Sequence, residues 1–290
     1  MHRKPAAPKP SPQPAPAAEP VTVGPIRQVA IDLDGTLLND SKQVSDQTAD
    51  ALYCLPARGV KVVIASARPP RSVRHVYQSL HLDTWQINYN GALIWDEPKR
   101  NVVFHRPLGG AVVRRMVETA RDLFDEVIVT CEVLDKWYTD RLDQTHTTET
   151  GRLFKPDVVG PLDDILAGEV TKLLLLGEPR MILRLEHVIA DGFGEHVSVV
   201  RTDEDMLQIM DRRVSKAVAL QVVAKHYGVD LPNVMAIGDA PNDVGMLQVA
   251  GVAVAMDNAH KLVKKVAHWV APSNNDHGVH AALVRYGLAE

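Results

Sequence analysis

The sequence predicts an α/β fold in which a doubly wound, mainly parallel sheet is interrupted by an inserted α+β unit. At both ends of the chain, short apolar runs rich in β-branched residues alternate with helical patterns, as at 28–32, 46–55 and 60–65. This alternation is typical of parallel strands joined by right-handed helical crossovers. This alternation of strand and helix patterns is absent over residues 106–200, which predicts a separate unit there.

The first core elements follow from local signals. The apolar run 28–32 reads as a buried strand, and Ser45 predicts the start of a helix that Pro56 ends. The continuous apolar run 60–65 predicts a strand of a parallel sheet, and 69–80 predicts a helix with proline in its first turn.

The middle of the chain has a different pattern. The Asn90-Gly91 dipeptide predicts a hairpin between strands at 86–90 and 92–95. The inserted unit is expected to contain helices at 109–124 and 180–190 and strands at 127–130, 136–139, 170–176 and 197–200. The strand–helix alternation of the core resumes near Met206, with helices expected at 216–227 and 242–249 and strands at 233–238 and 251–255.

Composition excludes several classes of protein. The 290 residues carry 32 Lys+Arg and 36 Asp+Glu, a formal net charge of -4, which argues against a nucleic-acid binder. No run approaches the ~20 apolar residues of a membrane-spanning helix. Two cysteines, Cys54 and Cys131, are too few for a disulfide framework and favour a reducing, cytoplasmic setting. Residues 1–25 hold eight of the 19 prolines, which predicts a disordered tail without the apolar stretch of a signal peptide.

Polar side chains gather just past the C-terminal ends of predicted strands, where open α/β sheets place their ligand sites. Asp32 and Asp34 precede Gly35, which permits a turn that brings the two acids together. Acids in this arrangement suit a nucleophile and a general acid/base. An ordinary turn is the alternative; a calcium loop does not fit, because such loops carry glycine at position 6 rather than position 4.

Two further segments give weaker signals. Ser66 follows a buried strand, where its hydroxyl and nearby amides could hold phosphate oxygens or simply cap a helix. Lys216 stands at the start of a predicted helix, a position that disfavours a cation by ~0.3–1 kcal/mol. Either it balances carboxylates and a phosphate or it reaches solvent, and the residues alone slightly favour an exposed lysine.

A last segment places Asp239, Asn242 and Asp243 after a very apolar strand. Hard oxygen ligands of this kind suit Mg²⁺, whereas a helix cap by Asn242 or Asp243 would leave Asp239 unexplained. Together with Asp32 and Asp34, four carboxylates at one sheet edge would repel one another. A divalent cation and a lysine offset that repulsion, so we expect Mg²⁺ as a cofactor.

In these residues the chain resembles the haloacid dehalogenase-like hydrolase superfamily, and more narrowly the Cof-type phosphatases with a class IIB cap. The motifs that carry the resemblance, in the family's order, are IDLDGTLLND, VVIASARP, INYNGALI, VSKAVAL, AIGDAPNDVGML and VAVAMDNA. The resemblance implies a catalytic core over 26–105 and 201–290. It also implies a cap over 106–200 that closes on the site and selects the leaving group.

The resemblance also implies roles for individual residues. Asp32 attacks phosphorus, and Asp34 protonates the leaving alcohol and later activates water. The implied phosphate-binding residues are Ser66, Ala67, Lys216 and Asn242. The implied Mg²⁺ site consists of Asp32, the backbone carbonyl of Asp34, Asp239 and, in a supporting position, Asp243. Where the family usually has Thr-Gly-Arg, this chain has Ser66-Ala67-Arg68, and Ala67 would be strained only at a positive φ.

The sequence therefore predicts a Mg²⁺-dependent phosphatase that hydrolyses small phosphorylated metabolites, with sugar phosphates favoured, through an aspartyl-phosphate intermediate. Two alternatives stay open: a sugar phosphomutase on the same fold, which needs a second phosphate site in the cap, and a non-catalytic phosphosugar-binding protein. The expected partner is a small phosphate ester, with neither nucleic acid nor membrane. Candidate selectors in the cap are Arg141, His146, Arg152, Lys172 and Arg184.

Overall fold

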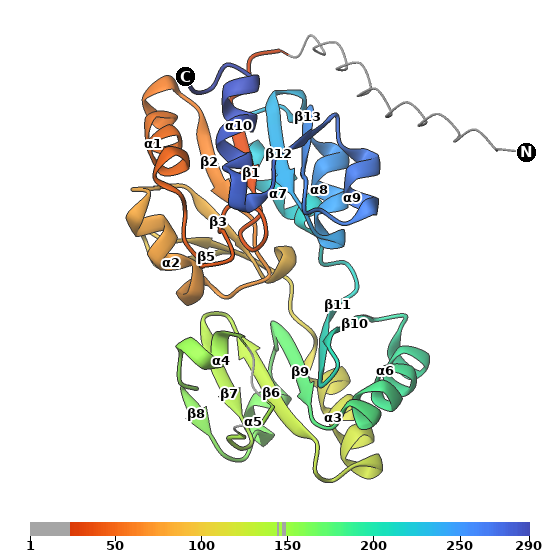
Figure 1. Ribbon diagram of the computed structural model, residues 1–290. Coiled ribbons are helices and arrows are strands. Elements are labelled where there is room, and N and C mark those ends of the chain that lie inside the picture. Colours follow the sequence, from red (N-terminus) through yellow and green to blue (C-terminus); the bar gives the residue numbers. More distant parts are fainter. Residues whose placement is uncertain (1–23, 144, 147–148) are drawn as a thin grey trace, which may run out of the picture.

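The structure is a computed structural model that describes residues 24–143, 145–146 and 149–290. The predicted tail, apart from its last two residues, lies outside this part of the chain. The described residues form a five-stranded sheet, a six-stranded sheet and a three-stranded sheet. Figure 1 shows two lobes, one built on the five-stranded sheet and the other on the six-stranded sheet. No helix in the described residues is long and apolar enough to cross a membrane.

The five-stranded sheet is parallel throughout, with the strand order β14-β13-β12-β1-β2. Its strands are β1 (Gln28–Ile31), β2 (Lys61–Ile64), β12 (Val234–Gly238), β13 (Val252–Met256) and β14 (Trp269–Ala271). Nearly every residue of the first four is buried, as expected of a sheet covered on both faces. The chain order reverses between β1 and β12, which makes the crevice at their C-terminal ends a natural ligand site.

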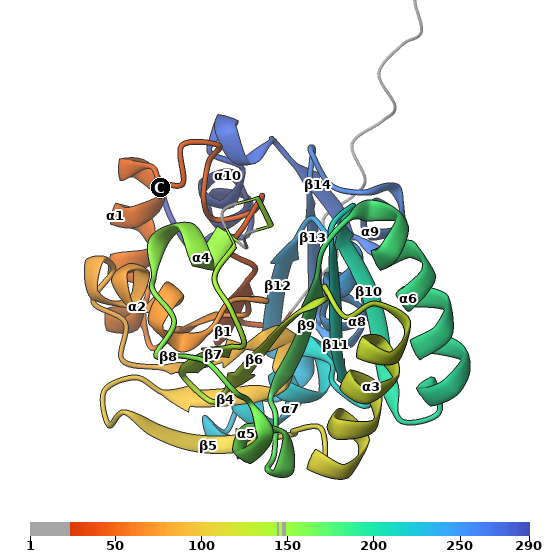
Figure 2. The same ribbon diagram turned by 90° about the horizontal axis from the view of Figure 1, so that it is seen from below.

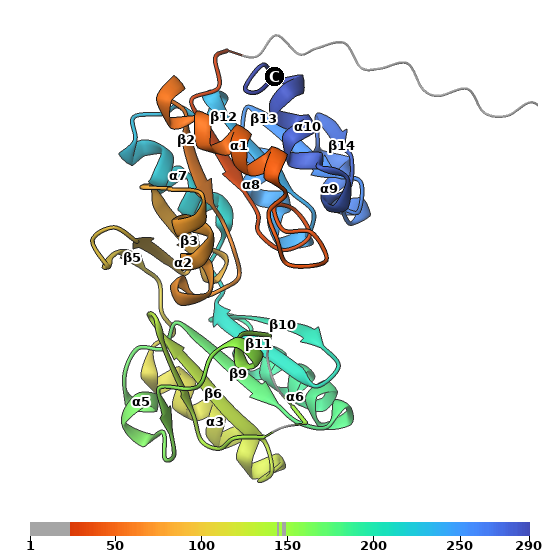
Figure 3. The same ribbon diagram turned by 60° about the vertical axis from the view of Figure 1, so that its left-hand side comes forward.

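Helices cover both faces of this sheet (Figures 1 and 3). Those on the face of α1 are α1 (Asp46–Cys54), α2 (Pro70–Ser79) and α10 (Gly278–Arg285). Those on the other face are α7 (Lys216–His226), α8 (Val244–Val249) and α9 (Lys261–Val266). Pro56 begins a short 3₁₀ turn directly after α1, so the proline ends the helix as predicted. The doubly wound core is therefore confirmed.

The three-stranded sheet contains the predicted hairpin. It consists of β3 (Trp85–Asn88), β4 (Leu93–Asp96) and β5 (Asn101–His105), paired antiparallel. The turn between β3 and β4 places Asn90 at φ 57° and Gly91 at φ 99°. A Cβ at Gly91 would lie 2.4 Å from the carbonyl oxygen of Ser215, so the close approach of the α7 N-terminus also requires glycine here.

The six-stranded sheet has the order β10-β11-β9-β6-β7-β8. Its strands are β6 (Ile128–Val133), β7 (Lys136–Thr139), β8 (Val158–Val159), β9 (Lys172–Leu176), β10 (Val197–Asp203) and β11 (Met206–Asp211). The accompanying helices are α3 (Gly110–Leu123), α4 (Glu149–Leu153), α5 (Asp163–Ala167) and α6 (Pro179–Phe193). Figure 2 shows α3 and α6 along one side of this sheet, and their apolar side chains form its main core.

One predicted boundary changes. The insertion was expected to end at residue 200, but this position lies inside β10, and β11 pairs with both β10 and β9. The apolar stretch at 206–210 resembles a core strand as readily as a cap strand, because only its partners distinguish the two. We therefore propose that the inserted unit extends to Asp211.

Candidate active site

Parallel pairing brings three carboxylates to one edge of the five-stranded sheet. Ile31 and Ile237 are register partners in β1 and β12, and Asp32 and Asp239 follow at the strand ends. One oxygen from each of Asp32, Asp239 and Asp243 lies within 4.8 Å of the others. Burial raises the pKa of Asp32 well above its usual range, and the Asp243 charge adds to this effect. Burial also raises the pKa of Asp239.

Lys216 lies between two of these acids. Its Nζ donates to Asp32 Oδ1 at 2.5 Å and to Asp243 Oδ1 at 2.7 Å, and its side chain is completely buried. Burial alone would lower the pKa of Lys216, but the Asp243 and Asp32 carboxylates outweigh it and raise that pKa above its usual value. The expectation of an exposed lysine is therefore wrong, because the acids make burial of the cation favourable.

Asp243 organises the loop that carries Asp239. Its Oδ2 accepts the backbone N–H groups of Asp239 (3.0 Å) and Ala240 (2.9 Å), while its Oδ1 accepts from Lys216. Pro241 occupies the first position of the short helix Pro241–Asp243, as its fixed φ favours. Both oxygens of Asp243 are thus engaged within the protein, so its position is that of a support rather than of a free ligand.

Asp239 is held by the loop after β1. Thr36 Oγ1 donates to Asp239 Oδ1 at 2.6 Å. Gly35 has φ 76°, and a Cβ there would lie 2.5 Å from Asp239 Oδ2. The carboxylate oxygens of buried Asp32 and half-buried Asp239 fit a hard divalent cation such as Mg²⁺. Such a cation would offset the negative charge of these acids that Lys216 alone does not balance.

Asp34 is oriented differently from these acids. Arg68 binds it through Nε at 2.6 Å and Nη2 at 2.5 Å, and Lys42 Nζ lies 2.8 Å from Oδ1. Burial acts to raise the pKa of Asp34, but Arg68 and Lys42 outweigh it and lower that pKa below its ordinary value. Among the described residues, its carboxylate does not join the cluster of Asp32 and Asp239.

The predicted phosphate-binding residues lie around the same edge. Ser66 is buried after β2, and its Oγ accepts the backbone N–H of Arg68. Ala67 is absent from the described residues with positive φ, so alanine is unstrained where the family usually has glycine. Asn242 is exposed, and its Nδ2 donates to Asn90 Oδ1 at 2.8 Å.

Sequence reasoning missed four polar residues that hold this arrangement together. They are Thr36, Lys42, Arg68 and Asn90. Thr36, Arg68 and Asn90 lie inside the motifs that carried the resemblance, so the signal was present in those segments. Lys42 lies outside them and becomes recognisable only through its ion pair with Asp34.

Comparison with known proteins decides the family. A family model described as haloacid dehalogenase-like hydrolase matches residues 29–283. The chain belongs to this family. It is 31% identical over 263 residues to the 5-amino-6-(5-phospho-D-ribitylamino)uracil phosphatase YitU of Bacillus subtilis, covering 89% of this chain and 96% of that protein. It is 28% identical over 287 residues to the phosphatase YwpJ of the same organism, covering 88% and 97% of the two chains.

Solved structures agree with this assignment. A haloacid dehalogenase-like hydrolase from Bacteroides thetaiotaomicron has a TM-score of 0.81 at 26% identity, covering 90% of this chain and 99% of the other. The protein TM0651 from Thermotoga maritima has a TM-score of 0.80 at 28% identity, covering 90% and 97%. The predicted resemblance, the fold class and the enzyme class, a hydrolase acting on phosphate esters, are thereby confirmed.

Proposed function

We propose that this haloacid dehalogenase-like hydrolase is a Mg²⁺-dependent phosphatase of small phosphorylated metabolites that works through an aspartyl-phosphate. One observation carries the proposal. The buried Asp32 carboxylate shares its edge of the sheet with Asp239 and is bound by the buried ammonium of Lys216. A nucleophilic carboxylate, a fixed cation and a second acid for a metal are the groups that phosphoryl transfer requires.

The first half of the reaction transfers the phosphoryl group to the protein. Asp32 attacks phosphorus through the oxygen that Lys216 does not bind, while the bond from phosphorus to the leaving oxygen breaks. Lys216 offsets the negative charge of the incoming phosphate, which otherwise repels the carboxylate. Asp32, Asp239 and the backbone carbonyl of Asp34 would hold Mg²⁺, which when bound supplies Lewis-acid stabilisation of the phosphoryl oxygens.

Asp34 transfers a proton both when the aspartyl-phosphate forms and when it is hydrolysed. It gives a proton to the leaving oxygen, and in the second half it takes one from the water that attacks phosphorus. The bond from phosphorus to the Asp32 oxygen then breaks, which releases inorganic phosphate and regenerates the Asp32 carboxylate. Arg68 and Lys42 hold it ionised in the present arrangement, which is the state that accepts a proton. To act as the acid, Asp34 must take up a proton and exchange these ion pairs for the leaving oxygen.

We further propose that the substrate is a phosphate ester of a sugar or a related polyol. The relative YitU acts, by its name, on a phosphoribitylamino-uracil, in which a polyol chain carries the phosphate.

We also propose a cytoplasmic location. Among the described residues both cysteines, exposed Cys54 and buried Cys131, are free thiols, which supports this location.

Phosphate release tests the proposed function. Purified protein is assayed with p-nitrophenyl phosphate and a panel of sugar and polyol phosphates, with Mg²⁺ or with EDTA. We expect Asp32→Asn to abolish turnover, since the amide is not a nucleophile. Asp257→Asn serves as the matched control, because the side chain of Asp257 is 70% exposed. The mechanism would be contradicted if the wild-type protein kept its full rate of hydrolysis in EDTA and the Asp32→Asn variant hydrolysed the esters at that same rate.

A further inference from the structure

Helices α3 and α6 cover one face of the six-stranded sheet, and we call the opposite face, which neither of these two helices covers, the open face. Val129, Cys131 and Leu173 pack with α3 and α6 in the core of this lobe. Because successive side chains of a strand alternate between faces, their neighbours point the other way. Glu132 of β6 and Lys172 of β9 are register partners on this open face. The open face also carries a small apolar cluster of Ile128, Leu174, Leu176 and Met206.

Lys172 lies where the open face meets the catalytic lobe. Its ammonium is 5.2 Å from the centre of the Tyr89 ring, and the Tyr89 hydroxyl lies 3.0 Å from Glu132 Oε2. Arg71 of α2 donates to both oxygens of Glu132 at 2.7 Å. Tyr89 also donates its backbone N–H to the carbonyl of Arg68, whose guanidinium binds Asp34. We call Arg71, Tyr89, Glu132 and Lys172 the junction cluster.

The ammonium of Lys172 has no hydrogen-bond or ion-pair partner in the described part of the chain. The residue is 8% exposed, yet none of the hydrogen bonds and ion pairs found among the described residues involves its Nζ. Burial lowers the pKa of Lys172, and Glu132 acts in the opposite direction. Burying an ammonium without acceptors is costly, and this group carries three donors. In the same cluster, Nε and Nη1 of Arg71 are buried without a hydrogen-bond acceptor among the described residues, and Nη1 lies 3.8 Å from Asp135 Oδ1 in an ion pair.

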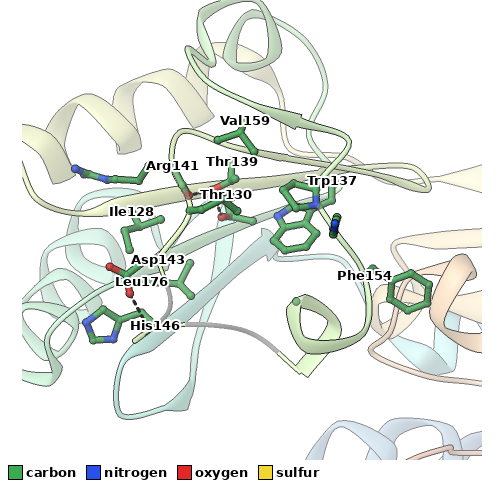
Figure 4. A pocket seen from close by; sticks show the side chains of 14 residues that line it. Ile128, Thr130, Trp137, Thr139, Arg141, Asp143, His146, Phe154, Val159 and Leu176 are labelled. Atoms are coloured by element: carbon green, nitrogen blue, oxygen red, sulfur yellow. Dashed lines mark hydrogen bonds between the residues drawn. The ribbon is translucent and has the colours of Figure 1, made fainter.

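A cavity of about 440 Å³ lies on the same face of the sheet as Glu132 and Lys172, and Figure 4 shows side chains that line it. Its floor comes from the strands, through Thr130, Trp137, Thr139 and Leu176. Thr130 stands two residues from Glu132 on the same strand and face, a separation of roughly 6–7 Å. The buried indole N–H of Trp137 also has no acceptor among the described residues. Among the described residues, donors without a hydrogen-bond acceptor therefore occur both in the junction cluster and in the cavity, and such donors suit a ligand rich in oxygen acceptors.

From this placement we propose that Lys172 determines specificity by donating hydrogen bonds to hydroxyl oxygens of the leaving group. The ligand class is a polyol or sugar chain that runs from the phosphate past Lys172 toward the cavity floored by Trp137. This inference rests on the proposed phosphatase function and deepens it, because it names the residue that reads the leaving group.

The test compares two esters in Lys172→Met, which keeps the length of the side chain and removes its charge. Ribitol 5-phosphate presents hydroxyl groups, whereas p-nitrophenyl phosphate presents none. We expect kcat/KM for ribitol 5-phosphate to fall on the order of 10- to 100-fold, as for the loss of hydrogen bonds to a charged donor. For p-nitrophenyl phosphate we expect a change below about 3-fold. Lys136→Met removes the same charge from an exposed position of the same sheet and should change neither rate.

Two results would overturn the assignment of Lys172. One is an equal effect of Lys172→Met on both esters, whether a shared fall or no change. The other is wild-type protein that hydrolyses p-nitrophenyl phosphate but none of the sugar and polyol phosphates. Failure of the phosphatase proposal itself looks different, because the wild-type protein would then release no phosphate from any ester with Mg²⁺ present.

Discussion

Replacing Lys216 by methionine tests how the charges of the active site are balanced. The side chain of Lys216 is fully buried, and its ammonium contacts Asp32 at 2.5 Å and Asp243 at 2.7 Å. Methionine fills a similar volume but leaves two buried carboxylates without their cation. Removing one partner of a buried ion pair costs about 3–5 kcal/mol. For a chain of this size each 1 kcal/mol lowers Tm by about 2–4 °C, so we expect a decrease of at least about 6 °C.

Thermal unfolding measured by circular dichroism in EDTA gives this difference directly. Adding Mg²⁺ should restore part of the lost Tm, because a bound cation offsets the Asp32 carboxylate, which is one of the two acids that Lys216 contacts. The double variant Lys216→Met with Asp243→Asn should also recover part of it. One stranded charge is then removed, while the amide oxygen can still accept the N–H groups of Asp239 and Ala240.

The outcome that refutes this reasoning is a metal-free Lys216→Met protein whose Tm lies within about 2 °C of the wild-type value, since that is less than 1 kcal/mol. Equal stability of the single and double variants would also contradict it. In that case the acids would not depend on the lysine for charge balance, and Lys216 would serve the bound phosphate alone.

Two more predictions concern the site and the thiols. Gly35→Ala should weaken Mg²⁺ binding at least about 10-fold in calorimetry, since the new Cβ would lie 2.5 Å from Asp239 Oδ2. Gly59→Ala, at a nearly identical φ with open space around it, should leave binding unchanged, and equal affinities in both variants would contradict the steric argument. Burial raises the pKa of Cys131 to about 12, so iodoacetamide at pH 8 should modify exposed Cys54 alone in native protein. Mass spectrometry that finds native Cys131 alkylated as fast as Cys54 would disprove its protection.

The catalytic edge could be predicted from the sequence because its signals are local. Asp32 and Asp239 each follow a continuous apolar strand, and in a parallel sheet such strand ends lie at one edge. Gly35 and Pro241 marked the turns that hold these acids. The positions of the strands and of the acids in the sequence were therefore enough to predict the site, without knowledge of the distances between the side chains.

The remaining interactions depend on partners that are distant in sequence. Lys216 is buried because Asp32, 184 residues away, and Asp243, 27 residues away, converge on it. Arg71 of helix α2 pairs with Glu132 of the six-stranded sheet across 61 residues. The local sequence around a charged residue at a helix start or on a short strand does not identify such a distant partner. Sequence patterns therefore slightly favoured an exposed Lys216. They offered Lys172 as a candidate selector but did not indicate its neighbours Arg71, Tyr89 and Glu132.

The order of strands in the five-stranded sheet has a consequence for synthesis of the chain. Thr36 and Asp239, which share a hydrogen bond in the finished site, are separated by 203 residues. At ~5–20 residues per second, roughly 10–40 s pass on the ribosome between the emergence of these two residues. Until β12 arrives, β1 lacks one of its two neighbours and exposes an unpaired edge that invites aggregation. Catalytic competence therefore arises only late in translation, after β12 has been synthesised and can pair with β1.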